Sequence, residues 1–450
     1  MKNLQPAPAP EEQLITGGLD YYKPTMSQLA YEQYPDAQIT FQLINRGQQR
    51  LADYVEPTEL QAKLDARRAK GFANEELDYL ASIEATNGQP VFANDYLNYL
   101  NDAKLPPTTV ALDPTMHDLT VATTGDWPLA TFWETVVMSD LNEMYFENLI
   151  AAHGLDPAKI YDQGDERLSQ KIAILQQRPD IKFAEFGTRR HFSLKWQKYV
   201  LERLVRECPQ NLVGTSNVAL ANSLNLRPIG TYAHELPMAY EGISRIEQRD
   251  ANPLDSHSRQ MSNWLARYPD YDTALTDTFG TDFFLADFAK PDANDHIPAQ
   301  PWRSVRHDSG DPFQFGDRFI NFLRENQIDP LTKTICFSDG LDIATIVQLA
   351  DYFAGRIKFN FGWGTTLTND LGLEPLNIVM KATRVETAGG SANLVKLSDS
   401  IGKHTGSEET IAELTREKQD FLANLSRNAE SFAEPHFDAG RRSRELVNAR

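Results

Sequence analysis

The chain has 450 residues, of which 41% are hydrophobic and 24% are charged, as is typical of a globular protein. Its 63 acidic residues against 44 Lys and Arg give a formal charge of −19, which argues against nucleic acid as the main partner, because phosphate backbones are bound by Lys and Arg. Only Cys208 and Cys336 are present, so we expect neither a disulfide framework nor a thiolate zinc site. Without a signal-peptide core or a long apolar run, we expect no membrane partner and a cytoplasmic location.

The first third of the chain mixes strand and helix patterns. Residues 1–13 are rich in Pro, Ala, Glu and Gln and are expected to form a flexible tail. Residues 14–150 are expected to form an α+β domain. Its expected elements are a strand at 37–46, helices at 58–72, 74–83 and 136–155, and a β-hairpin with a Gly-Asp turn within 119–135.

From about residue 181, within the expected barrel domain of 151–375, the chain repeats one pattern, in which a short apolar run ends in a polar or Gly-containing turn and is mostly followed by helical spacing. Such runs occur at 181–186, 211–214, 227–233, 302–306, 332–337 and 357–361. This repetition implies parallel strands with right-handed crossovers, as in an α/β barrel or a doubly wound sheet, and we favour the barrel. The polar candidates all follow strands, where barrel enzymes assemble their sites. Further along, 376–400 is typical of a hairpin with a Gly-Gly turn, and the chain from 405 is charged and largely helical.

Two glycine loops follow consecutive expected strands. Gly362 and Gly364 follow the strand at 357–361, and Gly340 lies in FSDG after the strand at 332–337. Glycines let backbone N–H groups approach an anion closely, so the loops predict phosphate binding, with ordinary tight turns as the alternative. Asp339 in FSDG either accepts hydrogen bonds from sugar hydroxyls or caps the following helix.

Charged residues follow other strands. Arg189, Arg190 and Arg306 are typical of a cradle for a polyanion, although each alone could form a surface ion pair. His234 ends an apolar run beside a carboxylate and could be a general base, a metal ligand, a covalent nucleophile or a structural residue. Asp308 and Asp311 in RHDSGDP could bind Mg²⁺, or form a turn before a helix.

Nine segments in this order together resemble the nicotinate phosphoribosyltransferase family. They are DYYKPTM (20–26), EFGTRRHF (185–192), GTSN (214–217), GTYAHE (230–235), LTDTFGTDFF (275–284), RHDSGDP (306–312), FSDGLD (337–342), FGWGTTLTND (361–370) and KLSDSIGK (396–403). The resemblance implies the type II phosphoribosyltransferase fold, an irregular α/β barrel over 151–375 with a second α+β domain formed by N-terminal and C-terminal segments. It further implies that 376–450 returns to the N-terminal domain and covers the barrel.

The resemblance also implies an activity and its partners. The reaction joins nicotinate to 5-phosphoribosyl-1-diphosphate, giving nicotinate mononucleotide and diphosphate in NAD salvage, coupled to ATP hydrolysis with Mg²⁺. The protein would be a homodimer with shared sites. The alternative is a phosphoribosyltransferase acting on nicotinamide or another pyridine.

Residue roles follow from the same resemblance. Tyr22 of the partner subunit and Phe186 would stack on the pyridine ring, and Arg189 and Arg306 would hold diphosphate and phosphoribosyl charges. The ribose and its 5′-phosphate would lie against Asp339, Gly340, Gly362 and Gly364.

His234 would be the residue that ATP phosphorylates, and Asp277 would orient its ring. Asp308 would also be catalytic, and Asp308 with Asp311 would hold Mg²⁺. Ser216 would select nicotinate, because related nicotinamide-using enzymes carry Asp there and a carboxylate would repel the nicotinate carboxylate. Four residues depart from the family pattern: Glu185 and His191, which could alter phosphate or cation contacts, and Pro24 and Trp363, which would change local packing only.

Overall fold

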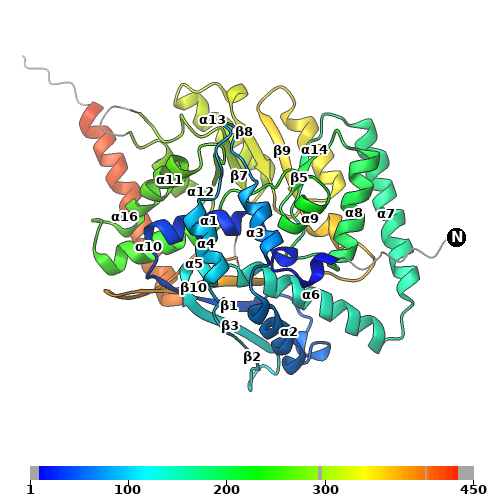
Figure 1. Cartoon of the computed structure of the whole chain (residues 1–450). Helices are drawn as coiled ribbons and strands as arrows, with labels where there is room; N and C mark the ends of the chain where they lie inside the picture. Colours follow the sequence, from blue (N-terminus) through cyan, green and yellow to red (C-terminus); the bar gives the residue numbers. More distant parts are fainter. Residues whose placement is uncertain (1–9, 292–295, 401–402, 434–450) are drawn as a thin grey trace, which may run out of the picture.

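The computed structural model describes residues 10–291, 296–400 and 403–433 of the chain, which form two sheets and the helices around them (Figure 1). The expected α/β class with two structural parts is confirmed. The α-helices are α1 (Tyr22–Gln33), α2 (Pro57–Lys70), α3 (Asn74–Ala81), α4 (Asn94–Asp102), α5 (Trp127–Ala130), α6 (Trp133–Ala152), α7 (Pro157–Gln177), α8 (Leu194–Glu207), α9 (Val218–Ser223), α10 (Glu235–Glu247), α11 (Ser256–Arg267), α12 (Thr281–Phe288), α13 (Pro312–Glu325), α14 (Ile343–Phe353), α15 (Thr365–Thr368) and α16 (Glu408–Ala433). Short 3₁₀ helices are η1 (Pro10–Gln13), η2 (Thr16–Gly18), η3 (Leu51–Asp53), η4 (Pro253–Asp255) and η5 (Pro330–Thr332).

The first sheet is antiparallel and unites the two ends of the chain. Its strands are β1 (Gln38–Asn45), β2 (Thr108–Leu112), β3 (Leu119–Asp126), β10 (Ile378–Thr387) and β11 (Gly390–Asn393), in the order β11-β10-β1-β3-β2. β1 pairs with β10 on one side and β3 on the other, and Ile39 and Phe41 point into the core. The expected hairpin at 376–400 is β10 and β11.

The second sheet is parallel and carries the polar candidates at its carboxyl edge. Its strands are β4 (Phe183–Glu185), β5 (Leu212–Thr215), β6 (Thr273–Leu275), β7 (Ser304–His307), β8 (Thr334–Phe337) and β9 (Lys358–Trp363), in the order β5-β4-β9-β8-β7-β6.

The segment expected as a strand at 227–233 is irregular and lies between β5 and β6. Ile229 N donates to Thr215 O (2.8 Å) on one side, and Tyr232 Oη accepts from Leu275 N (3.2 Å) on the other. Pro228 lacks an N–H and Gly230 lacks a side chain, so a regular ladder does not form there. The result is an irregular barrel.

Two local expectations are wrong. Residues 119–135 do not form a hairpin: β3 runs through Gly125, and Pro128, which suits the first turn of a helix, lies in α5. Residues 10–13 of the expected tail form η1, whose buried Glu11 accepts from Lys198 Nζ at 2.8 Å; residues 1–9 lie outside the described residues.

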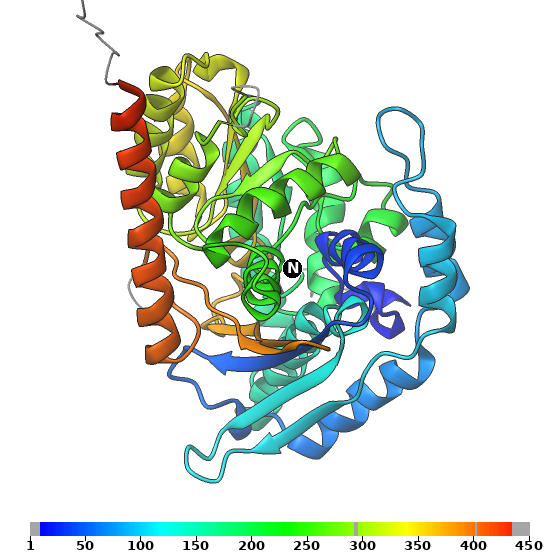
Figure 2. The same cartoon turned by 90° about the vertical axis from the view of Figure 1, so that its left-hand side faces the viewer.

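The C-terminal helix α16 lies along one side of the molecule, against barrel elements (Figure 2). A separate apolar cluster holds it there, formed by Leu254, Phe279, Phe283, Val395, Leu397, Leu414 and Phe421. Among the described helices, not one combines the length and the apolar surface that a bilayer crossing requires.

We expect Phe421→Ala to lower the free energy of unfolding by about 3 kcal/mol, because it removes a buried ring and leaves a cavity. Phe421 is buried, and its ring lies 4.8 Å from that of Phe283. Chemical denaturation measures the change. As a control, Leu112→Ala on β2, where the side chain is 52% exposed, should change it by no more than about 0.5 kcal/mol. Equal effects of the two substitutions would contradict this role for the cluster.

Candidate active site

Two adjoining cavities lie at the carboxyl edge of the parallel strands. One has a volume of about 320 Å³ and is called here the Tyr22 cavity; the other, of about 370 Å³, is called the His234 cavity. Phe186, Arg189 and Arg306 line both, so the cavities meet at these three side chains. All three follow or end barrel strands, as the sequence pattern predicts.

The His234 cavity is strongly cationic in a protein whose net charge is −19. Seven cationic side chains line it against four carboxylates. The cations are Arg46, Arg189, Arg190, Arg306, Lys381, Lys396 and Lys403, and the carboxylates are Glu134, Glu235, Asp308 and Asp339. A local excess of this kind attracts a polyanion whatever the distant surface charge, because salt screens the distant charge.

Sequence reasoning missed four of these cations. Arg46 follows β1 and Lys381 lies on β10, so both come from the antiparallel sheet, while Lys396 and Lys403 follow β11. A signal existed for Lys381, which interrupts the buried run Val379, Met380 and Ala382. A lysine inside a buried strand must face a partner or a ligand.

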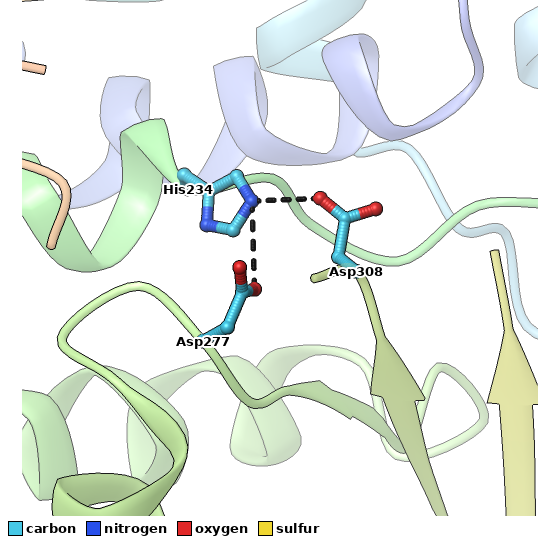
Figure 3. Close-up of side chains that lie close together, drawn as sticks. All are labelled: His234, Asp277 and Asp308. Atoms are coloured by element: carbon cyan, nitrogen blue, oxygen red, sulfur yellow. Dashed lines mark hydrogen bonds and ion pairs between the residues drawn. The ribbon is translucent and has the colours of Figure 1, made fainter. Parts of the chain in front are cut away.

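His234 lies where α10 begins, and polar groups surround its ring (Figure 3). Nδ1 is 3.0 Å from Thr278 Oγ1. Nε2 is 3.0 Å from Asp308 Oδ2, 3.7 Å from Asp277 Oδ1 and 2.8 Å from Lys396 Nζ. The carboxylate within hydrogen-bonding distance of the ring is therefore Asp308, whereas Asp277 was expected to orient it. Asp277 instead accepts hydrogen bonds from Ser309 Oγ (2.6 Å) and Lys396 Nζ (3.0 Å).

The ionisation states in this cluster follow from burial and from Lys396. Burial and the Lys396 ammonium lower the pKa of His234 to about 4, although both carboxylates oppose them, so the imidazole is neutral near pH 7. Burial alone would raise the pKa of Asp277, but Lys396 holds it below its usual range. Arg306, whose Nη2 lies 2.8 Å from Asp308 Oδ1, has the same effect on the pKa of Asp308.

The expected pairing of Asp308 with Asp311 at a metal is wrong. Asp311 is exposed, lines neither cavity, and caps α13 by accepting from Gln314 N (2.8 Å). Gly310, with φ of +86°, turns the chain away between the two aspartates. Asp277 and Asp308 are instead close enough, with His234, to share a cation, and their oxygens suit Mg²⁺. The Lys396 ammonium lies among them.

Two aromatic side chains, Tyr22 and Phe186, form part of the wall of the Tyr22 cavity. The Arg189 guanidinium lies 5.6 Å from the Tyr22 ring centroid, and that of Arg306 lies 5.6 Å from the Phe186 ring centroid. Tyr22 Oη is buried and, among the described residues, has no hydrogen-bond partner. A flat aromatic ring can stack on such side chains, with the two arginines nearby.

Tyr22 was expected from a partner subunit, but this chain's own Tyr22 lines its own cavity. The reason lies just before α1, where Asp20 pairs with Asn217 in an isolated bridge and Tyr21 N donates to Ser216 O at 2.7 Å. These bonds tie the start of α1 to the end of β5.

The glycines expected to surround a phosphate line the His234 cavity. Gly340 has φ of +60°, in the region that favours glycine. A Cβ on Gly362 would lie 2.4 Å from the Phe186 ring, and one on Gly364 would lie 2.9 Å from Phe186 O. These two glycines therefore also make room for the aromatic wall.

Ser216 and Asp339 both have charged partners. Ser216 Oγ donates to Asp20 Oδ1 (2.6 Å), and Asp20 Oδ2 lies 3.1 Å from Arg189 Nε. Sequence reasoning missed Asp20, although it begins the quoted segment DYYKPTM. Asp339 accepts from Lys403 Nζ at 2.7 Å; the cap of α14 is Asp342, so the capping alternative for Asp339 is wrong.

The two departures from the family pattern that could alter ligand contacts lie outside both cavities. Glu185 accepts from Thr215 Oγ1 (2.6 Å) and Gln197 Nε2 (3.0 Å), and burial raises its pKa to about 7. His191 Nδ1 lies 2.7 Å from Gln197 Oε1. Both are buried and belong to one network behind the Phe186 wall.

We expect polyanion affinity to depend on pH through Lys381. Burial, together with Lys396 and Arg189, lowers the pKa of Lys381 to about 7, although Glu134 opposes them. The ammonium is therefore present below pH 7 and lost above it. Calorimetry with inorganic diphosphate should show the wild-type protein binding roughly tenfold more tightly than Lys381→Met at pH 6, by direct charge attraction.

That advantage should shrink toward pH 8.5. The ionisation of diphosphate itself affects both proteins and cancels in the comparison. An advantage that stayed constant with pH would contradict a lowered pKa of Lys381.

Comparisons with known proteins match nearly the whole chain. The nicotinate phosphoribosyltransferase family matches residues 181–426, and the N-terminal domain of that family matches residues 19–142. A nicotinate phosphoribosyltransferase from Chromobacterium violaceum is 36% identical over 410 residues, covering 88% of this chain and 94% of that protein. One from Neisseria meningitidis is 35% identical over 414 residues, with 89% and 96% covered.

Solved structures agree. A nicotinate phosphoribosyltransferase from Porphyromonas gingivalis superposes with a TM-score of 0.78 at 30% identity, covering 90% of this chain and 99% of that one. One from Vibrio cholerae gives a TM-score of 0.76 at 30% identity, with 92% and 96% covered.

Proposed function

Because the chain belongs to the nicotinate phosphoribosyltransferase family, we propose that it joins nicotinate to 5-phosphoribosyl-1-diphosphate, forming nicotinate mononucleotide and diphosphate in NAD salvage. One observation carries the proposal: a cavity with aromatic walls adjoins a cationic cavity, and Phe186, Arg189 and Arg306 line both. A pyridine in the first would meet a phosphoribosyl group in the second at these side chains.

The bond change takes place where the cavities meet. The pyridine nitrogen bonds to C1 of the ribose, and the C1–O bond to diphosphate breaks, so the electron pair leaves with diphosphate. Arg189 and Arg306 stabilise the negative charge on the departing diphosphate. Tyr22 and Phe186 stack on the pyridine ring and fix its orientation for attack. Asp339 is available to the ribose hydroxyls if Lys403 moves toward phosphate.

ATP coupling through His234 is a second part of the proposal. A neutral imidazole nitrogen attacks the γ-phosphorus, an N–P bond forms, and the P–O bond to ADP breaks. The neutral state of His234, which follows from its lowered pKa, and the nearby Lys396 ammonium support this step. Nδ1 lies beside Thr278 Oγ1, and Nε2 lies beside Asp308 and Lys396, so whichever nitrogen attacks must first lose that contact. Asp277 and Asp308 would hold Mg²⁺, which would neutralise phosphate charge.

One observation favours nicotinamide as a second candidate substrate. Ser216 Oγ already donates to Asp20, so a carboxylate does stand beside Ser216. Such a carboxylate can accept from an amide N–H₂ and would repel the carboxylate of nicotinate. Arg189 opposes this repulsion, since its Nε lies 3.1 Å from Asp20.

We expect labelled nicotinate, with phosphoribosyl diphosphate and Mg²⁺, to yield nicotinate mononucleotide, and ATP to increase the yield. Labelled nicotinamide under the same conditions is the comparison. If only nicotinamide gives product, the fold assignment stands, but the site selects the amide through Asp20. No product from either would overturn the proposed function.

We expect His234→Ala to abolish the stimulation by ATP while some nucleotide synthesis remains, because the transfer site and the phosphate acceptor are separate groups. Acid-labile, base-stable phosphate on the protein, measured after incubation with γ-labelled ATP, should disappear in the same variant. Full ATP stimulation in His234→Ala would show that the residue carries no phosphate.

Dimerisation and location stay proposals as well. Both cysteines are buried and unpaired, which suits a reducing cytoplasm. Since Tyr22 lines the cavity of its own chain, we propose that any homodimer leaves catalysis to each subunit.

Specific activity should then stay constant on dilution through a dimer–monomer transition followed by analytical ultracentrifugation. Activity that falls as dimers dissociate would show that the partner contributes to the site.

A further inference from the structure

Lys23 lies at a point where three helices begin. It is the second residue of α1, and it contacts Glu134 in the first turn of α6 and Glu235 in the first turn of α10. Its Nζ lies 2.5 Å from Glu134 Oε2, 2.6 Å from Glu235 Oε2 and 3.1 Å from Thr131 Oγ1. The Lys23 side chain has no exposed surface, and those of the two glutamates are 5% and 3% exposed.

Lys23 and Glu134 are charged despite this burial. Burial alone would lower the pKa of Lys23, but the two carboxylates raise it above its usual value. Burial would raise the pKa of Glu134, but Lys23 and Arg189 lower it to about 2. The carboxylates also lie at helix N-termini, where negative charge is favoured and a lysine alone would not be.

Stability alone does not account for such a cluster. Burying an ion pair costs desolvation energy that the mutual attraction roughly repays, so apolar or neutral groups of equal volume are often as stable. Charged groups instead fix the relative positions of the side chains that they bond, because each hydrogen bond constrains where its partner lies.

Both carboxylates connect Lys23 to the active site. Glu235 follows His234 in the chain, and its other oxygen accepts from Trp127 Nε1 at 2.6 Å, so the start of α10 is held from two sides. Glu134 Oε1 lies 3.3 Å from Arg189 Nη1, and because Lys23 occupies its Oε2, Glu134 does not engage Arg189 with both oxygens. Lys23 itself follows Tyr22.

We propose that Lys23 is a positioning residue, which through Glu134 and Glu235 sets Arg189 and His234 relative to the Tyr22 wall. It touches neither cavity and acts only through these partners. The inference rests on the proposed function, because nicotinate binding and His234 phosphorylation are the two properties it links.

The main test replaces the whole cluster by neutral groups of similar size, Lys23→Met with Glu134→Gln and Glu235→Gln. This variant buries no unpaired charge, so we expect it to fold. Misplacing Arg189 and His234 should raise the KM for nicotinate and slow phosphate transfer to His234, each by about tenfold or more. Affinity for inorganic diphosphate is measured by calorimetry in Lys23→Arg instead, because that variant keeps Glu134 and Glu235, which themselves line the His234 cavity; it should fall, since Arg189 lines the same cavity.

A matched control removes a buried ion pair of the same helix away from the site. Arg67 and Asp140 form two hydrogen bonds of 2.6 Å between α2 and α6 and line neither cavity. Arg67→Met with Asp140→Asn should leave KM and the phosphorylation rate unchanged, whatever its effect on the melting temperature. A merely structural role for Lys23 predicts the same pattern for the neutral cluster.

Lys23→Arg provides a second variant if the neutral cluster fails to fold. It keeps the charge but changes the position of the donors, so the same two kinetic effects should appear in weaker form. A folded variant of either kind with wild-type KM and phosphorylation rate would overturn the inference. Wild-type protein that forms no nucleotide would instead overturn the proposed function, and diphosphate affinity would still test the role of Lys23.

Discussion

A buried charge without a partner costs desolvation energy, and pairs of opposite charge formed for this reason organise much of the site. Arg189 illustrates it, lying between Asp20 and Glu134 while lining both cavities. Lys23 lies between two glutamates, and Lys396 lies among His234, Asp277 and Asp308. Arg189, Arg306, Lys396 and Lys403 are therefore already paired with acidic groups before any ligand arrives. Arg46, Arg190 and Lys381 form no salt bridge with the described residues, so a bound polyanion competes with carboxylates at the first four cations and meets unpaired charge at the other three.

The two sheets contribute different parts of the site. The parallel strands present Arg189, Arg306 and the glycine loops at one edge, as barrel strands do. The antiparallel sheet and the segment after β11 bring Arg46, Lys381, Lys396 and Lys403 over that edge. Because strands from both ends of the chain pair in the antiparallel sheet, the cationic wall exists only once the chain has folded back on itself. The charge of the cavity is thus a property of the whole fold.

Much of the fold could be predicted from local sequence patterns. The alternation of β1, the strand–loop–helix repeats and the hairpin of β10 and β11 all follow from short-range periodicity, which neighbouring residues determine. The same holds for Arg306 near the end of β7, whereas His234 follows an irregular segment rather than the strand expected there. The hairpin expected at 119–135 was wrong because a Gly-Asp pair also occurs inside a strand that has partners on both sides. Pairing between distant strands outweighed the local turn preference.

Partnerships between distant residues were beyond sequence reasoning. Asp311 and Asp308 are near in sequence but separated by a turn, whereas Asp277, thirty-one residues away from Asp308, shares its cluster. Asp20 and Ser216 are almost two hundred residues apart and hydrogen-bonded.

The sequence alone determined the fold class, the family and the residues after barrel strands, because these depend on local order and on motif content. Only the tertiary structure decided which carboxylate faces His234, that Asp20 stands beside Ser216, that Tyr22 lines a cavity of its own chain, and that Lys23 joins three helix starts. The physical reason is that a buried charge is matched by proximity in space, which the order of residues does not encode locally.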